Sequence, residues 1–502
     1  MIDTADMDIT QMSDMEKLWA YNGLDVGVTL EVLHALRAQI DPVAEATYTF
    51  SRSLQGPILE MSARGLRVDL HKRDELVSEG REKIAQLEAQ LDTIICDGVG
   101  TTLNWRSPTQ LKSLLYDMMK LPPVRKRNSN GGFSPTVDRD ALEKLQFHFI
   151  AQPIIAHILA LRDIGKQIGT LVTGIDADGR MRSNFNIAGT VTGRLASSSS
   201  DFGTGTNMQN WTKKLREIFI ADPGMKFVNI DLEQADARNV GARLYKLYGD
   251  SAYLDACESG DLHTTVTRMS RPDLPWTGDP SADRAIADGP GYRHLTCRDL
   301  SKKLGHGTNF FGKPPTMAKH SQLPIPVIQE FQERYFGAFP AIPKWHAWVA
   351  LEIGTTGSLT TLFGRRRYVM GRRNDDSTLR EMIAYEPQSM TADEINKAML
   401  RIFRADLAQL MLQVHDSLVL QIPEDREDEL IPQLRECFNN PITIRDRQFN
   451  VPCDVQTGWN LNEQKENKDG SITNELGLTK YKGGDLRRRP AQLSLEQRLG
   501  IG

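Results

Sequence analysis

The chain has 502 residues, 40% of them hydrophobic, which is enough for several domains with buried cores. Its net charge of −4 and its five cysteines, none in a CxxC pair, exclude a strongly basic protein, a disulfide framework and a thiolate zinc site. No run approaches the roughly 18 apolar residues of a membrane span, and the acidic start is unlike a secretory signal, so we expect a cytoplasmic protein.

The first predicted elements are helices. Residues 52–91 have an apolar helical pattern interrupted at Gly65, and the stretch 103–119 begins a second helix at a Ser-Pro pair. Basic patches that can contact phosphates, although each alone is more typical of a solvated face, lie at 125–127, 213–216, 302–303, 365–367 and 372–373.

Two aspartates are predicted at the ends of β-strands. The apolar run 225–232 is typical of a strand that leads into a helix, with Asp231 at the junction. Residues 407–422 are typical of a tight hairpin with His415 and Asp416 in its turn. Either aspartate alone is more often a surface or capping residue. Together they suit two-metal phosphoryl transfer, in which carboxylates share divalent ions about 3.5 to 4 Å apart.

A cationic helical face is predicted between these two aspartates. Arg298, Lys302 and His306 recur at every fourth position, and Phe310 follows at the same interval. A helix places such residues on one face, where they can hold a triphosphate and a nucleobase. A solvated amphipathic helix explains the triplet equally well.

Three other segments lack a regular pattern. Residues 123–135 are basic and rich in Gly and Asn, which predicts a mobile loop. Residues 271–292 are rich in Pro, Gly and Asp, which predicts an irregular segment. The polar sequence beyond about Asn462 predicts a flexible tail.

Six motifs, in the same order, resemble those of family A DNA polymerases, the DNA polymerase I-like class. They are TGRLASSS with NMQN (192–199 and 207–210), DLEQADAR (231–238), RDLSKKLGHGTNFFG (298–312), TLFGRRR (361–367), REMIAYEPQSMTAD (380–393) and MLQVHDSLVL (411–420). GLRVD (65–69) and SPTQL (107–111) resemble the thumb of that family. The series spans nearly the whole chain, and the resemblance implies a template-directed DNA polymerase.

The resemblance implies a role for each matching residue. It implies catalysis by Asp231, Asp416 and Lys302, with two Mg²⁺ ions, for which Mn²⁺ can substitute, held by Asp231, Asp416 and the carbonyl of Leu232. It implies dNTP binding by Arg298, Lys302, His306, Phe310, Asp236, Gln234 and Leu232. It implies contacts with primer-template DNA by Arg194, Asn207, Gln209, Asn210, Arg380, Gln388 and His415. In this scheme Lys302 protonates the leaving pyrophosphate and Arg298 holds the γ-phosphate.

The resemblance also implies an α+β right-hand fold, in which an antiparallel palm sheet carries helical fingers and thumb. The expected divisions are an exonuclease-domain remnant at 1–44, a thumb at 45–165, a palm at 166–238 and 351–463, fingers at 239–350 and a C-terminal tail at 464–502. Tyr21 and Asp25 resemble the YxxxD of the third exonuclease motif, but the first two motifs have no room before them, so we expect no proofreading by this chain. An amphipathic helix that packs on the thumb is the alternative for this segment.

The sequence departs from the family at the sugar-selecting positions. Asp236 stands where the family has the Glu that excludes ribonucleotides, Phe310 replaces its Tyr partner, and Phe311 stands in the place of Gly. Phenylalanine cannot donate a hydrogen bond, so we expect sugar discrimination to rest on packing of Phe310 and to be somewhat relaxed. His306 also replaces the usual Phe or Tyr, and Ser417 replaces the usual Glu.

Two alternatives stay open. The HDS sequence at 415–417 is also the form found in single-subunit phage RNA polymerases, although the TGRL and NMQN segments favour a DNA polymerase. A catalytically inactive DNA-binding subunit would keep the fold, but the intact acidic and cationic residues argue against it. We expect a replicative enzyme of a phage or mobile element, in the host cytoplasm and without a membrane. Its expected partners are primer-template DNA, dNTPs and a separate exonuclease or another replisome protein.

Overall fold

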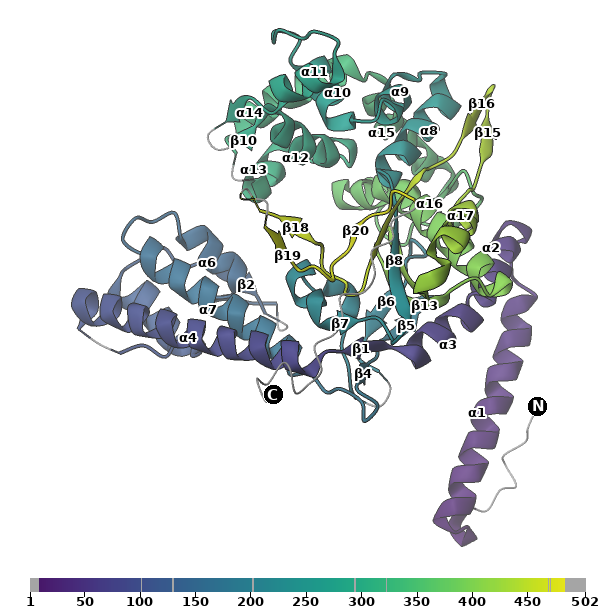
Figure 1. Ribbon diagram of the computed structural model, residues 1–502, viewed down its shortest axis with the longest axis horizontal. Coiled ribbons are helices and arrows are strands. Elements are labelled where there is room, and N and C mark those ends of the chain that lie inside the picture. Colours follow the sequence, from purple (N-terminus) through teal and green to yellow (C-terminus); the bar gives the residue numbers. More distant parts are fainter. Residues whose placement is uncertain are drawn as a thin grey trace.

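The computed structural model describes residues 9–100, 102–128, 131–200, 203–292, 295–321, 323–467, 469 and 471–483. Figure 1 shows a central sheet with its helices, a helical lobe on the left, a second helical lobe above, and one helix that projects away from the rest. As labels taken from the predicted divisions, we call the first three parts the palm, the thumb lobe and the fingers lobe, and we call the last the projecting helix. Helices combined with antiparallel sheets confirm the predicted α+β class.

The palm is built on a five-stranded antiparallel sheet with the order β13-β14-β8-β17-β20. Its strands are β8 (Met225–Leu232), β13 (Gln409–Val414), β14 (Ser417–Pro423), β17 (Cys453–Gly458) and β20 (Thr479–Lys480). The predicted strand at 225–232 and the predicted hairpin at 407–422 are therefore confirmed. Successive side chains of a strand point to opposite faces. Val228 and Ile230 thus face the core, while Asn229 and Asp231 face an open cleft.

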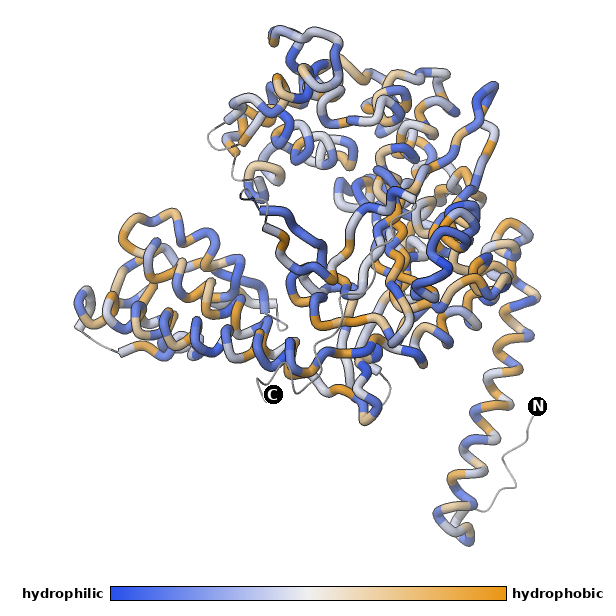
Figure 2. The backbone as a smooth tube through the Cα atoms, viewed as in Figure 1, coloured by the Kyte–Doolittle hydropathy of each residue, from blue (hydrophilic) through white to orange (hydrophobic). Residues whose placement is uncertain are grey.

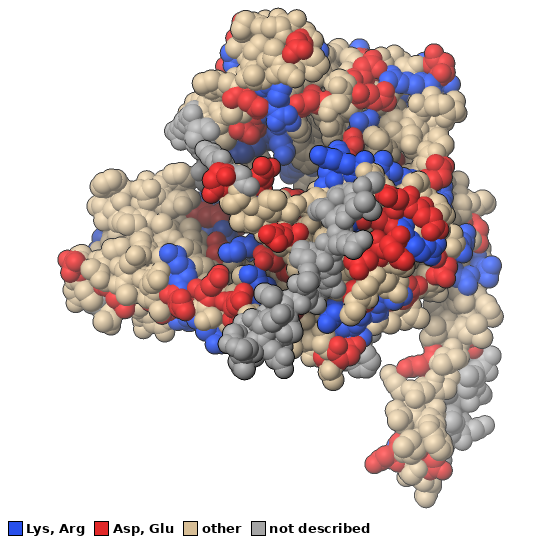
Figure 3. All heavy atoms as spheres, viewed as in Figure 1, with Lys and Arg blue, Asp and Glu red and all other residues tan. Residues whose placement is uncertain are grey.

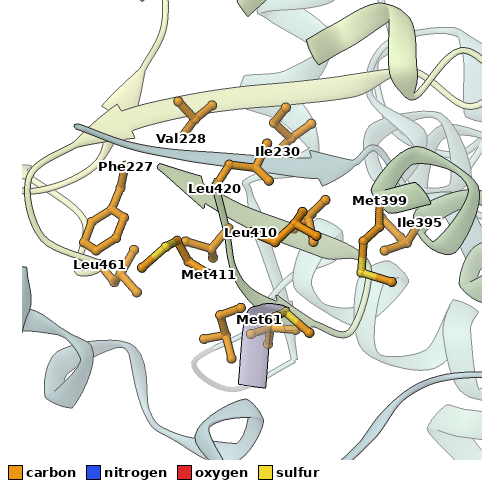
Figure 4. Packing of buried hydrophobic residues seen from close by; sticks show 14 of the residues in the cluster. Met61, Phe227, Val228, Ile230, Ile395, Met399, Leu410, Met411, Leu420 and Leu461 are labelled. Atoms are coloured by element: carbon orange, nitrogen blue, oxygen red, sulfur yellow. The ribbon is translucent and has the colours of Figure 1, made fainter. Parts of the chain in front are cut away.

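The palm core lies between the sheet and its helices. α3 (Gln55–Arg64) and α16 (Asp376–Ala405) contact β13, and α17 (Glu427–Cys437) packs beside α16. Figure 4 shows one cluster formed by side chains of these elements, among them Met61, Val228, Ile230, Ile395, Met399, Leu410 and Leu420. Each fully buried aliphatic side chain contributes roughly 1.5–3 kcal/mol. This core therefore fixes the sheet that carries Asp231.

The start of the predicted thumb range packs with the palm instead. α2 (Pro42–Ser53) leads into α3, and Leu54, Ile58 and Met61 are buried in the palm core. The apolar face of residues 54–61 finds its partners in α16 and β13, which sequence periodicity alone does not show.

The thumb lobe has a core of its own. Its helices are α4 (Leu70–Val99), α5 (Pro108–Lys112), a π-helical turn (Ser113–Met118), α6 (Arg139–Leu145) and α7 (Gln152–Leu171). α4 and α7 pack along each other over buried leucine and isoleucine side chains. The predicted mobile loop at 123–135 is wrong in part, because β2 (Arg125–Arg127) and β3 (Phe133–Pro135) pair as a hairpin. Residues 129–130 of that loop lie outside the described residues.

The fingers lobe is almost entirely helical. Its helices are α8 (Ala235–Tyr248), α9 (Ala252–Glu258), α10 (Leu262–Ser270), α11 (Pro280–Ala287), α12 (Cys297–Asn309), α13 (Pro314–Ser321), α14 (Ile325–Ala338) and α15 (Ala341–Thr356). The irregular segment predicted at 271–292 is wrong in part. Asp279 caps α11 by accepting from the amide of Ala282, and β9 (Pro290–Tyr292) pairs with β10 (Leu295–Thr296).

Short strands and single helical turns connect these parts. They are β1 (Leu66–Val68), β4 (Arg180–Met181), β5 (Asn184–Asn186), β6 (Ala196–Ser198), β7 (Phe219–Ile220), β11 (Ser358–Thr360), β12 (Arg366–Tyr368), β15 (Ile442–Ile444), β16 (Arg447–Phe449), and the 3₁₀ turns η1 (Ile9–Gln11), η3 (Met208–Asn210), η4 (Lys213–Ile218) and η5 (Glu424–Arg426). Within the described ranges, no helix combines the length and the apolar character needed to cross a bilayer.

The two ends of the chain differ from the expectations. The projecting helix α1 (Asp14–Arg37) buries none of its residues, so the alternative that it packs on the thumb is wrong. Figure 2 shows hydrophobic residues along its whole length, and Trp19 and Tyr21 are exposed. The flexible tail expected beyond Asn462 is wrong up to residue 483, because β18 (Lys465–Glu466) pairs with β19 (Ile472–Thr473) and β20 extends the palm sheet. The rest of the predicted tail, 484–502, lies outside the described residues.

Candidate active site

Asp231 and Asp416 lie at the same end of two neighbouring strands. β8 and β14 pair so that Asp231 is opposite Ser417, and the Leu232 amide donates to the backbone carbonyl of Asp416 at 3.0 Å. His415 has a φ of 53°, a left-handed conformation that closes the short turn between β13 and β14. The two aspartates, far apart in the sequence, are therefore side by side, as the strand patterns predict.

The two carboxylates repel each other in a largely buried setting. Burial, followed by the nearby Asp416 charge, raises the pKa of Asp231 to about 7. Burial is also the main cause that raises the pKa of Asp416. A divalent cation between the two side chains would relieve both effects.

Asp231 and Asp416 suit Mg²⁺ better than a metal ion whose ligands must all come from the protein. Within the part of the chain that the structure describes, no group of three or more His, Cys, Asp or Glu side chains could hold a metal ion. Mg²⁺ is typically bound through one or two carboxylates, while water and substrate phosphates complete its octahedral shell. Asp231 and Asp416 supply that minimal set.

The aspartates border an open cleft of about 310 Å³ on the palm. Its lining includes Lys213, Arg216, Asn229, Asp231, His415, Asp416, Ser417, Asp454, Gln456, Leu461, Glu463 and Leu478. Figure 3 shows Lys and Arg side chains of the upper lobe gathered where that lobe faces the hollow centre of the molecule. An anionic ligand in the centre would therefore meet acidic groups from the palm and cationic groups from the fingers lobe.

The predicted cationic face is present on α12. The helix starts with a capping box in which Thr296 accepts from the amide of Asp299 and Asp299 accepts from the amide of Thr296. Lys302 and His306 are exposed on it. Burial lowers the pKa of His263 on α10, and the nearby charges of Arg298 and Lys302 lower it further.

Asp261 is a partner of this face that the sequence did not indicate. Its Oδ1 lies 3.0 Å from Nη2 of Arg298, and its Oδ2 lies 3.0 Å from Nη1 of Arg284. Although burial acts in the opposite direction, hydrogen bonds led by that of Arg298 hold the pKa of Asp261 well below its usual value. Arg298 is thus already paired with a carboxylate in this structure.

The predicted sugar-selecting residues are brought together. The rings of His306 and Phe310 are 4.6 Å apart, and Phe310 caps the end of α12 instead of continuing the helix. Although part of the His306 side chain reaches solvent, desolvation by the atoms packed around its ring lowers its pKa, an effect that the nearby Asp236 charge opposes. Asp236 lies 3.4 Å from Nη2 of Arg194. Thr391, which the sequence analysis missed, donates its hydroxyl to Asp236 at 2.7 Å.

The other predicted substrate and DNA contacts are distributed around the cleft. Gln209 donates to the backbone and to the side chain of Gln413 on β13, both at 3.0 Å. Asn207 accepts from Ser197 at 2.5 Å, and Asn210 is exposed. These bonds fix the NMQN turn on the palm.

Three more predicted residues lie near α8 and on α16. Gln234 precedes α8 with a φ of 54°, and its buried Oε1 has no hydrogen-bond partner within the described residues. Arg380 lies near the start of α16, and Gln388 lies in its middle, half-buried.

An antiparallel palm sheet that carries two adjacent carboxylates beneath a cationic helix defines the class of right-hand polymerases. The model of DNA polymerase family A matches residues 73–465. The chain belongs to this family.

Relatives and a solved structure agree with that assignment. The thermostable DNA polymerase I of Thermus aquaticus is 28% identical over 421 residues, which cover 81% of this chain and 47% of the relative. DNA polymerase I of Deinococcus radiodurans is 26% identical over 452 residues, covering 87% and 44%. The chain thus spans about half the length of the curated relatives it matches. The POL domain of Pol1 from M. smegmatis, in complex with DNA primer-template and dNTP, aligns with a TM-score of 0.64 and 25% identity over 82% of this chain and 69% of that chain. This alignment confirms the right-hand fold.

Proposed function

We propose that this chain is a template-directed DNA polymerase that adds dNTPs to a primer 3′-hydroxyl. One observation carries the proposal: Asp231 and Asp416 meet at the end of the palm sheet, in a cleft that the cationic helix α12 faces. The solved relative that binds primer-template and dNTP supports the choice of substrates. The division into thumb, palm and fingers, the two-metal mechanism and the replicative role in a phage or mobile element belong to this proposal.

In this proposal the chain aligns the reactants and neutralises their charge. Asp231, Asp416 and the Leu232 carbonyl would hold two Mg²⁺ ions, which activate the 3′-hydroxyl and stabilise charge on the leaving oxygen. Lys302 would donate a proton to the pyrophosphate, and Arg298 would exchange Asp261 for the γ-phosphate.

Selection of the nucleotide would depend on the residues around Asp236. Asp236 is held from two sides by Arg194 and Thr391, at 3.4 and 2.7 Å. These contacts take the place of the Tyr hydrogen bond that Phe310 cannot make. Phe310 and His306 would pack against the sugar. The 2′-hydroxyl of a ribonucleotide would then lie against one of these rings and against the carboxylate of Asp236.

A primer-extension assay with Mg²⁺ tests the proposal. Asp231→Asn and Asp416→Asn should each lower dNTP addition by about 10³-fold, because several kcal/mol of metal-mediated stabilisation are lost. Asp454→Asn is the matched control, since Asp454 is opposite Asp231 on β17 but pairs with Lys480 at 2.7 Å. Addition of rNTPs only would support an RNA polymerase. DNA binding without extension would support an inactive subunit.

A further inference from the structure

The last described part of the chain forms an addition to the palm. The family match ends at residue 465, whereas β19 and β20 come after it. We call residues 461–483 the C-terminal segment. β20 pairs with β17, with Gln456 opposite Lys480, and β18 pairs with β19. Figure 1 shows the β18–β19 hairpin between the palm and the thumb lobe.

Buried contacts fix the C-terminal segment to the palm. Leu461 and Leu478 are 5% and 7% exposed and belong to the palm core, and Figure 4 shows Leu461 beside Phe227. The amide of Leu478 donates to the carbonyl of Asn462 at 2.8 Å. A Cβ atom on Gly458 would lie 2.5 Å from the carbonyl oxygen of Gly477, so glycine is required for this close approach.

The segment also borders the catalytic cleft. Leu461, Glu463 and Leu478 line the same cleft as the two catalytic aspartates. Glu463 Oε1 lies 2.6 Å from Nζ of Lys213, which starts η4 and lines the same cleft. The Lys213 side chain is 72% exposed and that of Glu463 is 37% exposed, so water and solutes reach the pair.

We propose that the C-terminal segment forms one wall of the primer-template groove. In the absence of DNA, the Glu463 carboxylate binds Lys213 at the place where a DNA backbone phosphate would bind. The inference rests on the proposed function, because a primer end that reaches Asp231 and Asp416 must pass through the cleft that this segment lines. A carboxylate and a phosphate are both anionic acceptors for a lysine ammonium group. The exchange is easy, since an exposed ion pair is worth only about 0.2–1 kcal/mol.

Equilibrium binding of primer-template DNA, measured by fluorescence anisotropy with EDTA and without nucleotide, tests this inference. Glu463→Gln should tighten binding by about two- to fivefold, because DNA no longer competes with a carboxylate for Lys213. Glu475→Gln is the matched control, since Glu475 is an exposed acid of the same segment outside the cleft lining, and it should leave binding unchanged.

A lysine variant and a double mutant complete the test. Lys213→Ala should weaken binding and reduce the slope of log K against log salt concentration by about 1, as expected for one lost phosphate contact. The loss should be larger in the Glu463→Gln background, where the lysine is free of its internal partner. Equal binding by the Glu463→Gln and Glu475→Gln variants, or an unchanged salt slope for Lys213→Ala, would overturn the proposal.

The binding measurement separates this inference from the proposed function. If the wild-type chain extends primers but Glu463→Gln does not tighten binding, the inference alone fails. If Glu463→Gln tightens binding but the wild-type chain adds no nucleotide, the proposed polymerase activity fails and the DNA path along the C-terminal segment stands.

Discussion

Replacing Thr391 with valine isolates the contact that holds Asp236. The Thr391 hydroxyl lies 2.7 Å from Asp236 and 3.0 Å from the Pro387 carbonyl. A hydroxyl carries one hydrogen, and the charged acceptor forms the stronger bond. Valine keeps the shape of the side chain but removes this donor. Among the side chains that the structure describes, Arg194 then remains as the partner of Asp236, at 3.4 Å.

The size of the effect follows from the geometry. A hydrogen bond to a charged group contributes about 1.5–3 kcal/mol. We use the lower end of this range because the contact with Arg194 remains. The population of the Asp236 conformation seen in the structure should therefore fall by about tenfold. We therefore expect the preference of dNTP over rNTP in Thr391→Val to fall by about tenfold. Thr391→Ser, which keeps the hydroxyl, should retain the preference.

Single-turnover insertion of matched dNTP and rNTP measures this preference. Asn239 donates to the Thr391 hydroxyl at 3.2 Å, so the valine variant also removes one acceptor of this buried amide and should lower the melting temperature. The ratio of the two insertion efficiencies is independent of the fraction of folded enzyme. A destabilised Thr391→Val variant with an unchanged dNTP to rNTP ratio would refute the reasoning.

Four further predictions follow from the same geometry. Lys302→Ala should lower the rate of nucleotide addition by about 10²- to 10⁴-fold, as for loss of a general acid. Lys303→Ala on the same helix should have little effect, and rapid-quench kinetics compares the two variants. Removal of Mg²⁺ with EDTA should abolish extension but leave primer-template binding measurable by anisotropy. Ile230→Ala should destabilise the protein by about 2–5 kcal/mol in denaturant unfolding, because Ile230 is fully buried in the palm core. Burial raises the pKa of Glu394 from 4.5 to about 8, so the folded state holds a proton that the unfolded state releases, and stability falls as pH rises from 4.5 to 8. Glu394→Gln should remove this loss of stability at high pH, so that the variant melts at a higher temperature than the wild type at pH 9. Equal melting temperatures at pH 9 would contradict a raised pKa of Glu394.

Sequence reasoning located Asp231 and Asp416 because their signals are local. Asp231 ends an apolar run and Asp416 lies between two apolar runs, so each marks the end of a strand. Because both strands bury one face, the register in which β8 pairs with β14 is fixed. The cationic face of α12 could also be predicted from the sequence, since a spacing of four residues places side chains on one helix face.

The missed contacts depend on pairings between distant segments. Thr391 reaches Asp236 only because α16 packs across α8, and Asp261 reaches Arg298 because α10 packs on α12. The strands after residue 464 are short and polar and lack the alternation that marks a half-buried strand. β20 forms because the edge of β17 supplies backbone partners, and β18 and β19 form by pairing with each other.

The double pairing of Asp261 has a consequence for the nucleotide binding that we propose for the fingers lobe. Asp261 accepts from Arg284 as well as from Arg298, so the departure of Arg298 would not strand an uncompensated anion. Arg284 can keep the acid neutralised while its neighbour turns to the incoming triphosphate. In the proposed function Arg298 would leave Asp261 for the triphosphate, and nucleotide affinity should then depend on how firmly Arg284 holds Asp261.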